Sequence, residues 1–189
     1  MSIFHQNNIE IQEEALVIEK AKKNSAEFEL LYNKYFDRIY VFIYNRTADK
    51  DLSGDLTQQV FLKALYNIKS YKFKGLPFSA WLYRIALNEI NQFFRKSKKM
   101  QTFSIDEKCF ANIVESVEEE NFDEKHQILI ESLNKLPKES VNLIQLRFFE
   151  NYSFKEIGVI LGITENNAKV KIYRVLDKIK SFIRKSTKK

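Results

Sequence analysis

The sequence predicts an all-α protein made of two small helical domains. Only 4 Gly and 2 Pro occur among 189 residues, too few for the many tight turns of an all-β fold. Apolar residues make up 44% of the chain and recur at spacings of three and four, the period of a buried helix face. This pattern is lost over residues 98–124, where the charge also changes sign. We therefore expect two helical blocks joined by a flexible acidic linker.

The first block contains four predicted helices, over residues 9–23, 26–44, 49–68 and 77–97. A loop around Gly75 separates the last two helices. Pro77 suits a first helical turn, because its fixed φ is compatible with the start of a helix. We expect the first helix, within residues 1–25, to pack on a domain formed by residues 26–99.

Residues 100–125 are predicted to be an acidic linker, and residues 126–189 a second helical domain. Between Ser104 and Glu124 there are eight acidic residues and a single lysine. Two interpretations stay open: a solubilising loop, or a segment with a role of its own beside a basic body. Helical periodicity resumes near Lys125, breaks at Pro137 and ends in two helices over residues 153–185.

The composition argues against several classes of function. Two histidines, one cysteine (Cys109) and no Gly-rich phosphate loop leave no recognisable catalytic, metal or cofactor site, so we expect no enzyme and no cofactor. A single cysteine cannot form an intrachain disulfide, and no run of about 18 apolar residues exists. We expect a cytoplasmic protein without membrane insertion. Its net charge of +6 favours a polyanionic partner.

The predicted helix over residues 77–99 has two chemically different faces. One is a broad apolar stripe for burial, although it includes Glu89, for which the sequence offers no explanation. The other combines cations, amides and a large ring, which unstacked bases require because they offer both a π-face and hydrogen-bonding edges. It consists of Trp81, Arg84, Asn88, Asn91, Gln92 and Arg95, and the preceding loop adds Lys72, Phe73 and Lys74. The alternative is an ordinary solvated face with a partly buried Trp81.

Residues 153–185 have the pattern of a helix-turn-helix. Ser153 and Glu156 form a capping box that begins a short helix, Gly162 ends it, and Thr164 can cap a second, longer helix. From residue 165 to the end there are nine Lys and Arg residues against two acidic ones, which favours phosphate contact. In such units the N-terminal part of the second helix lies in the major groove. The alternative is a helical hairpin with an ordinary glycine turn.

Four stretches, in this order, form a specific combination: FELLYNKYF (28–36), DLTQQVFLKAL (55–65), FSAWLYRIALNEINQFFRK (78–96) and the segment 136–180 with its helix-turn-helix. Together they resemble the extracytoplasmic-function (ECF) group of the sigma-70 family. The first two are similar to the opening and polymerase-binding helices of sigma region 2. The third resembles its minus-10 recognition helix, and the fourth resembles region 4, which recognises the minus-35 element.

The resemblance implies an initiation factor that binds core RNA polymerase and promoter DNA. Polymerase contact, with the clamp helices of the largest subunit, is implied for Asp55, Gln58, Gln59 and Leu62. The minus-10 element would be bound by the face of helix 77–99 and the loop 71–75 described above. The minus-35 element would be bound by Thr164, Asn166, Asn167, Lys169, Val170, Lys171, Tyr173 and Arg174. Family membership also implies contact of region 4 with the flap of the second-largest subunit, and an anti-sigma partner.

Two positions depart from the family pattern. Gln59 stands where glutamate is usual, which removes one charge from the polymerase contact. Val170 replaces a small polar residue and could pack against a thymine methyl group, which predicts a T-rich feature in the promoter.

Three other functions remain as alternatives. A free-standing helix-turn-helix regulator would bind duplex DNA without polymerase, but it leaves the polar face of helix 77–99 unexplained. An enzyme would need a catalytic constellation that the sequence does not offer. A helical adaptor protein would keep its activity when the polar groups of Arg84, Asn88, Lys169 and Arg174 are removed by substitution.

Overall fold

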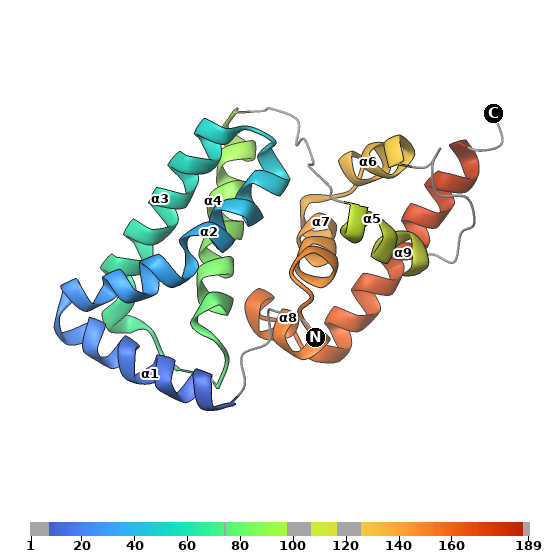
Figure 1. Ribbon diagram of the computed structural model, residues 1–189. Coiled ribbons are helices and arrows are strands. Elements are labelled where there is room, and N and C mark those ends of the chain that lie inside the picture. The colour runs from blue at the N-terminus through green and yellow to red at the C-terminus, as the bar shows by residue number, and fades with distance from the viewer. Residues whose placement is uncertain (1–7, 74, 98–106, 117–125, 187–189) are drawn as a thin grey trace. The chain divides into compact units, whose positions relative to one another are not determined.

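The computed structural model describes residues 8–73, 75–97, 107–116 and 126–186, and all its regular elements in these ranges are helical. The chain forms two compact units, Met1–Lys99 and Met100–Lys189 (Figure 1). None of the described helices is long and apolar enough to cross a membrane.

Unit 1 is a bundle in which α2 packs against both α3 and α4, and α1 lies against α2 (Figure 1). Its helices are α1 (Asn8–Lys23), α2 (Phe28–Thr47), α3 (Lys50–Asn67) and α4 (Phe78–Ser97), with short 3₁₀ turns at Ser25–Glu27 and Ile68–Ser70. All four predicted helices are confirmed, each within a few residues of its expected ends. The core between them is rich in aromatic rings, such as the edge-to-face pair of Phe42 and Tyr83 with centroids 4.7 Å apart.

Local signals set the ends of the helices in unit 1. Ala48 adopts a left-handed conformation (φ 48°) and closes α2, and the Asp49 side chain then caps α3 by accepting from the Leu52 amide at 3.0 Å. The start of α4 differs, because the preceding residue, Pro77, has no side-chain donor or acceptor. The first amide of α4 is instead bonded to a residue of α1, as described below.

Unit 2 consists of α5 (Glu107–Ser116), α6 (His126–Asn134), α7 (Lys138–Ile144), a π-helical turn (Gln145–Phe149), α8 (Phe154–Leu161) and α9 (Glu165–Ser186). The long α9 packs against α6, α7 and α8 (Figure 1). The break predicted at Pro137 is confirmed, since α7 begins directly after it.

The expectation that the acidic segment has no helical structure is wrong for part of its length. Helix α5 lies inside it and packs against the π-helical turn of unit 2. Phe110, Ile113 and Val114 are buried at spacings of three and four, the pattern of an amphipathic helix. The surrounding acidic residues obscured this short stripe. The rest of the predicted linker, 98–106 and 117–125, lies outside the described residues.

The helix-turn-helix is confirmed in detail. Ser153 and Glu156 form the predicted capping box, and Gly162 ends α8 with a left-handed φ of 71°. The Thr164 hydroxyl accepts from the Asn167 amide at 3.2 Å and so caps α9. Gly158 allows the close approach of turn and helix, because a Cβ there would lie 2.8 Å from the carbonyl oxygen of Ile163.

Candidate nucleic-acid interface

The polar face predicted on α4 lies on the surface of unit 1. Arg84, Asn88 and Arg95 are exposed, so their guanidinium and carboxamide groups can meet a ligand. Trp81, Asn91 and Gln92 are half-buried, and the carboxamide oxygen of Asn91 is buried without a hydrogen-bond partner among the described residues. Asn91 is therefore turned further inward than the helical wheel suggests. The apolar stripe on the other side, including Leu82, Ala86 and Ile90, is buried as predicted.

Three aromatic rings form a cluster at the start of α4. The Trp81 ring lies 5.0 Å from that of Tyr71 and 5.3 Å from that of Phe78, measured between centroids. Tyr71 and Phe78 also meet edge to face at 5.3 Å. Burial, together with the charge of Glu14, raises the pKa of Tyr71 to about 12, so its hydroxyl stays neutral. One part of Trp81 is thus held by the cluster while the rest remains accessible.

The loop before α4 places further groups beside this cluster. Lys72 is exposed, and Phe73 is 38% exposed, a large fraction for a phenylalanine. Lys74 lies outside the described residues. A solvent-exposed ring and a lysine directly after Tyr71 offer the stacking surface and the charge that single-stranded nucleic acid requires.

Two buried carboxylates connect the helices of unit 1, and sequence analysis did not predict their partners. Glu14 lies in the apolar stripe of α1 and bonds to α2 and α4. Glu89, unexplained in the sequence, is 6% exposed and pairs with Lys63 of α3 at 2.6 Å, which ties α3 to α4. The signal available in the sequence was the same for both: a carboxylate inside an apolar helix face, which needs a partner from another element.

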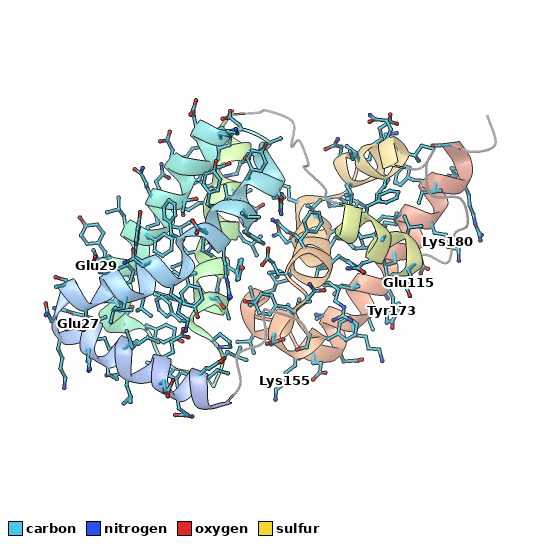
Figure 2. The ribbon with its side chains drawn as sticks, in the orientation of Figure 1. Glu27, Glu29, Glu115, Lys155, Tyr173 and Lys180 are labelled. Atoms are coloured by element: carbon cyan, nitrogen blue, oxygen red, sulfur yellow. The ribbon has the colours of Figure 1, made fainter. Side chains whose placement is uncertain are left out.

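The DNA-facing side predicted for unit 2 lies on the first turns of α9. All but one of the predicted residues are exposed there: Thr164, Asn166, Asn167, Lys169, Val170, Tyr173 and Arg174. Tyr173 is 53% exposed on α9 (Figure 2), and its ring lies 6.2 Å from Phe154 of α8. The opposite side of α9, with Ala168 and Ile172, is buried. Helix α9 thus exposes polar and basic side chains on one side and buries apolar side chains on the other.

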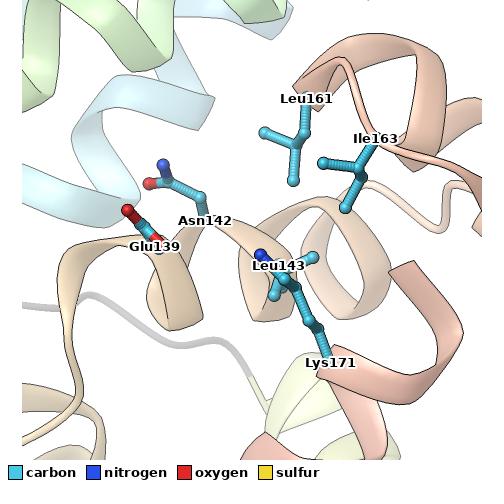
Figure 3. Close-up of a pocket in the computed structure, with 6 residues that line it drawn as sticks. All are labelled: Glu139, Asn142, Leu143, Leu161, Ile163 and Lys171. Carbon is cyan, nitrogen blue, oxygen red and sulfur yellow. The ribbon is translucent and has the colours of Figure 1, made fainter. Parts of the chain in front are cut away.

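Lys171 is the exception among the predicted minus-35 residues. It is half-buried and lines a hollow of about 280 Å³ within unit 2, beside Leu143 (Figure 3). The remaining walls are Glu139, Asn142, Leu161 and Ile163. Lys171 therefore occupies the side of α9 that faces α7, and its predicted base or phosphate contact has less support than those of Lys169 and Arg174.

The residues predicted to bind polymerase lie along the outer side of α3. Asp55, Gln58 and Gln59 are exposed, and Leu62 is 52% exposed. Gln58 and Leu62 border an open groove of about 380 Å³ between α2 and α3, whose other walls are Phe28, Glu29, Tyr32, Phe61 and Leu65 (Glu29 is labelled in Figure 2). An apolar groove rimmed by polar groups is typical of a protein-binding surface. The sequence predicted the rim of this surface but not its apolar floor.

The exposed side chains of the two polar surfaces are of the kinds that bind nucleic acids. Within the described part of the chain, no group of His, Cys, Asp and Glu could hold a metal ion. The two polar surfaces carry cations, amides and aromatic rings, which recognise phosphates and bases.

Comparison with known proteins identifies the family. The sequence profile of sigma-70 region 2 matches residues 31–100, and that of sigma-70 region 4 matches residues 126–179. The RNA polymerase sigma factor SigZ of Bacillus subtilis is 30% identical over 156 residues, which cover 82% of this chain and 86% of SigZ. This chain belongs to the sigma-70 family. The helix α4 lies in its region 2, and the helix-turn-helix lies in its region 4.

A second relative of this sigma-70 protein is named as an ECF sigma factor. The ECF RNA polymerase sigma factor BldN of Streptomyces coelicolor is 31% identical over 163 residues, 85% of this chain. The chain spans 62% of the length of BldN. The fold is shared with the sigma factor RpoE from Bartonella quintana, solved in complex with the anti-sigma factor NepR: the TM-score is 0.57 at 18% identity, covering 84% of this chain and 97% of that one.

Proposed function

We propose that this chain is an ECF sigma factor that directs core RNA polymerase to promoters and binds different forms of DNA with two separate surfaces. The α9 edge of unit 2 binds the minus-35 element as duplex, and the α4 face of unit 1 captures minus-10 bases that have left the duplex. The groove and the exposed side of α3 bind the clamp helices of polymerase. The factor performs no catalysis itself, needs no cofactor and acts in the cytoplasm, where polymerase works.

The observation that supports this proposal most is the chemistry of α4 and its loop. Duplex DNA hides the faces of its bases, so exposed rings such as Phe73 and the open part of Trp81 are useful only for unstacked bases. The neighbouring Arg84 and Asn88 supply a charge for phosphates and an amide for base edges. Binding energy spent on the unpaired strand stabilises the melted promoter, so recognition and opening become one event.

Run-off transcription tests the proposal. Genomic fragments are transcribed by core polymerase with and without this protein, and we expect new start sites only when it is present. The double variant Arg84→Ala, Asn88→Ala should abolish these transcripts, whereas the exposed control Lys69→Ala should not. Identical start sites and rates with and without the protein would end the interpretation.

The competing function, a free-standing helix-turn-helix regulator, makes an opposite prediction for isolated protein. Such a regulator binds duplex DNA tightly without polymerase, whereas a sigma factor binds weakly until it joins the core enzyme. Gel-shift titration with and without core polymerase separates the two. The family profile over region 2 favours the sigma factor.

A T-specific contact is proposed for Val170, which is 39% exposed on α9. Its methyl groups can pack against a thymine C5-methyl in the major groove. Selection from a randomised minus-35 library should show a T preference that Val170→Ser loses. An unchanged preference would remove Val170 from the recognition surface.

An anti-sigma protein is also proposed as a partner, since the structural neighbour RpoE was solved with one. The apolar groove between α2 and α3, with Phe61 and Leu62, is a suitable docking surface. An inhibitor seated there would compete with polymerase for the same side chains.

A further inference from the structure

Glu14 is a carboxylate in an apolar position of α1. Its side chain shares one helix face with Ile11, Ile18 and Ala21, and only 4% of the residue is exposed. Placing an ionised carboxylate away from water is costly unless hydrogen bonds replace the lost solvation. The partners of Glu14 therefore indicate what the position does.

Three donors from two other helices meet at this carboxylate. From α2, the Tyr35 hydroxyl donates to it, and Lys34 Nζ lies 2.8 Å from Oε1. From α4, the backbone amide of Phe78 donates to Oε2 at 2.6 Å, across 64 residues of sequence. Phe78 is the first residue of α4, and a negative charge at a helix N-terminus is stabilised by the helix dipole. Glu14 thus replaces the local cap that Pro77 cannot supply.

The amide that Glu14 holds belongs to the centre of the aromatic cluster. The Phe78 ring packs against those of Tyr71 and Trp81, and also lies 6.1 Å from the ring of Tyr35. Tyr71 is the last buried residue before the exposed loop that continues into Lys72 and Phe73. The Glu14 carboxylate therefore supports the first turn of α4 directly and, through the Phe78 ring, also supports Tyr71, the buried residue from which the loop continues.

We propose that Glu14 is a positioning residue for capture of the unpaired promoter strand. It sets the first turn of α4 and, through Phe78, the placement of Trp81 and the loop. The N-terminal helix α1 is then part of the strand-capture site although none of its side chains needs to touch DNA. This inference rests on the proposed function, because it assigns the role of Glu14 to the minus-10 step.

The variants that test it are Glu14→Gln, Glu14→Ala and the control Glu13→Gln. Glu13 is the exposed neighbour on the same helix, so its variant makes the same chemical change without touching the network. Glutamine keeps one oxygen for the Phe78 amide but places an NH₂ group among the donors from α2. We expect Glu14→Ala to weaken binding of the single strand most, Glu14→Gln to weaken it less and Glu13→Gln to leave it unchanged.

The measurement uses holoenzyme, assembled from core polymerase and each full-length variant. The first probe is a single-stranded oligonucleotide copied from the non-template minus-10 strand of a promoter found by run-off transcription. The second is the upstream duplex with the minus-35 element. Glu14→Ala should weaken single-strand binding by about tenfold, the effect of losing one charge-assisted hydrogen bond. Core assembly and duplex binding should stay unchanged.

In the free full-length protein, Trp81 provides a direct spectroscopic readout, because it is the only tryptophan of the chain. Its emission should shift in the same order as the binding defect: largest in Glu14→Ala, smaller in Glu14→Gln and absent in Glu13→Gln. Equal single-strand binding by wild type and Glu14→Ala would overturn this inference alone. Parallel loss of core assembly, duplex binding and strand binding would also overturn it, since Glu14 would then only stabilise unit 1. Failure of the wild-type holoenzyme to bind the strand would instead overturn the proposed function, and this inference with it.

Discussion

The two surfaces proposed to bind DNA in this sigma factor are supported in different ways. In unit 2 the helix ends within the helix-turn-helix are set by neighbours in sequence: the Ser153–Glu156 capping box, the left-handed Gly162 and the cap at Thr164 all lie within a dozen residues. In unit 1 the α4 face depends on partners far away in the chain. Glu14 bonds to α4 across 64 residues, and Lys63 reaches Glu89 across 26.

This difference has a physical basis in what each surface is proposed to bind. A duplex groove has a nearly constant shape, so a rigid local unit that presents one helix edge is sufficient. Captured single-stranded bases need rings, amides and cations brought together from a loop and a helix. The side chains of such a site must be held in place by the packing beneath them. Buried carboxylates can fix this packing because they accept several hydrogen bonds at once.

The largest effect on the free energy of unfolding is expected at Gly158 of unit 2, where a larger side chain has no space. In Gly158→Ala the new methyl group would lie 2.8 Å from a backbone carbonyl oxygen in the turn, so we expect a loss of about 3 kcal/mol, the upper range for overpacking. The matched change in unit 1, Gly54→Ala, meets nothing within 4 Å and should gain about 0.5–1 kcal/mol as a helix-favouring substitution. Urea unfolding with hydrogen exchange of α8 and α3 amides measures both. Equal changes in the free energy of unfolding at the two glycines would contradict the expected difference between the two units.

The next effect concerns the long-range pair of unit 1. Lys63→Met leaves the buried carboxylate of Glu89 without its ion-pair partner, and should cost about 2 kcal/mol. The double variant Lys63→Met, Glu89→Leu should recover most of that loss, since it also removes the buried carboxylate that Lys63→Met leaves unpaired. Lys69→Met, on the exposed turn after α3, serves as the control. Additive losses in a double-mutant cycle would contradict a coupled pair.

A smaller loss is expected for the local cap of unit 2. Ser153→Ala removes the hydroxyl that accepts from the Glu156 amide, which should cost about 1 kcal/mol. Ser181→Ala, at an exposed position of α9, is the control and should have little effect. Thermal unfolding by circular dichroism compares the two variants. A loss from Ser153→Ala as large as that from Lys63→Met would remove the contrast between local and long-range support.

The smallest expected effect on the free energy of unfolding comes from Tyr71 and appears only at high pH. The hydroxyl of Tyr71 stays protonated up to a pKa of about 12 in the folded protein, whereas an unfolded tyrosine loses its proton near pH 10. The unfolded state therefore binds fewer protons between these values, and the free energy of unfolding falls as pH rises from 10 to 12. Tyr71→Phe should make that fall shallower in urea titrations, and Tyr66→Phe, 80% exposed, should not. Identical slopes for the two variants would show that Tyr71 does not titrate differently from an exposed tyrosine.

Prediction from sequence succeeded where the cause lies within a few residues. The helix periods, the stop at Pro137 and the caps of the helix-turn-helix were recognised because each is a local stereochemical requirement. It failed for α5, where only Phe110, Ile113 and Val114 mark a stripe among many charges. The predicted DNA and polymerase contacts remain predictions, although most of those side chains are exposed and Lys171 is turned toward the hollow.

By itself, the sequence determined that the chain is helical, that it has two units and that two polar surfaces with the chemistry of nucleic-acid recognition exist. The tertiary structure decided which helix ends and rings those surfaces depend on. Glu14 and Glu89 look like irregularities in apolar stripes until the fold brings the Phe78 amide and Lys63 to them. Periodicity specifies which face of a helix is buried, but the partner of a buried charge is set only by the packing of distant segments.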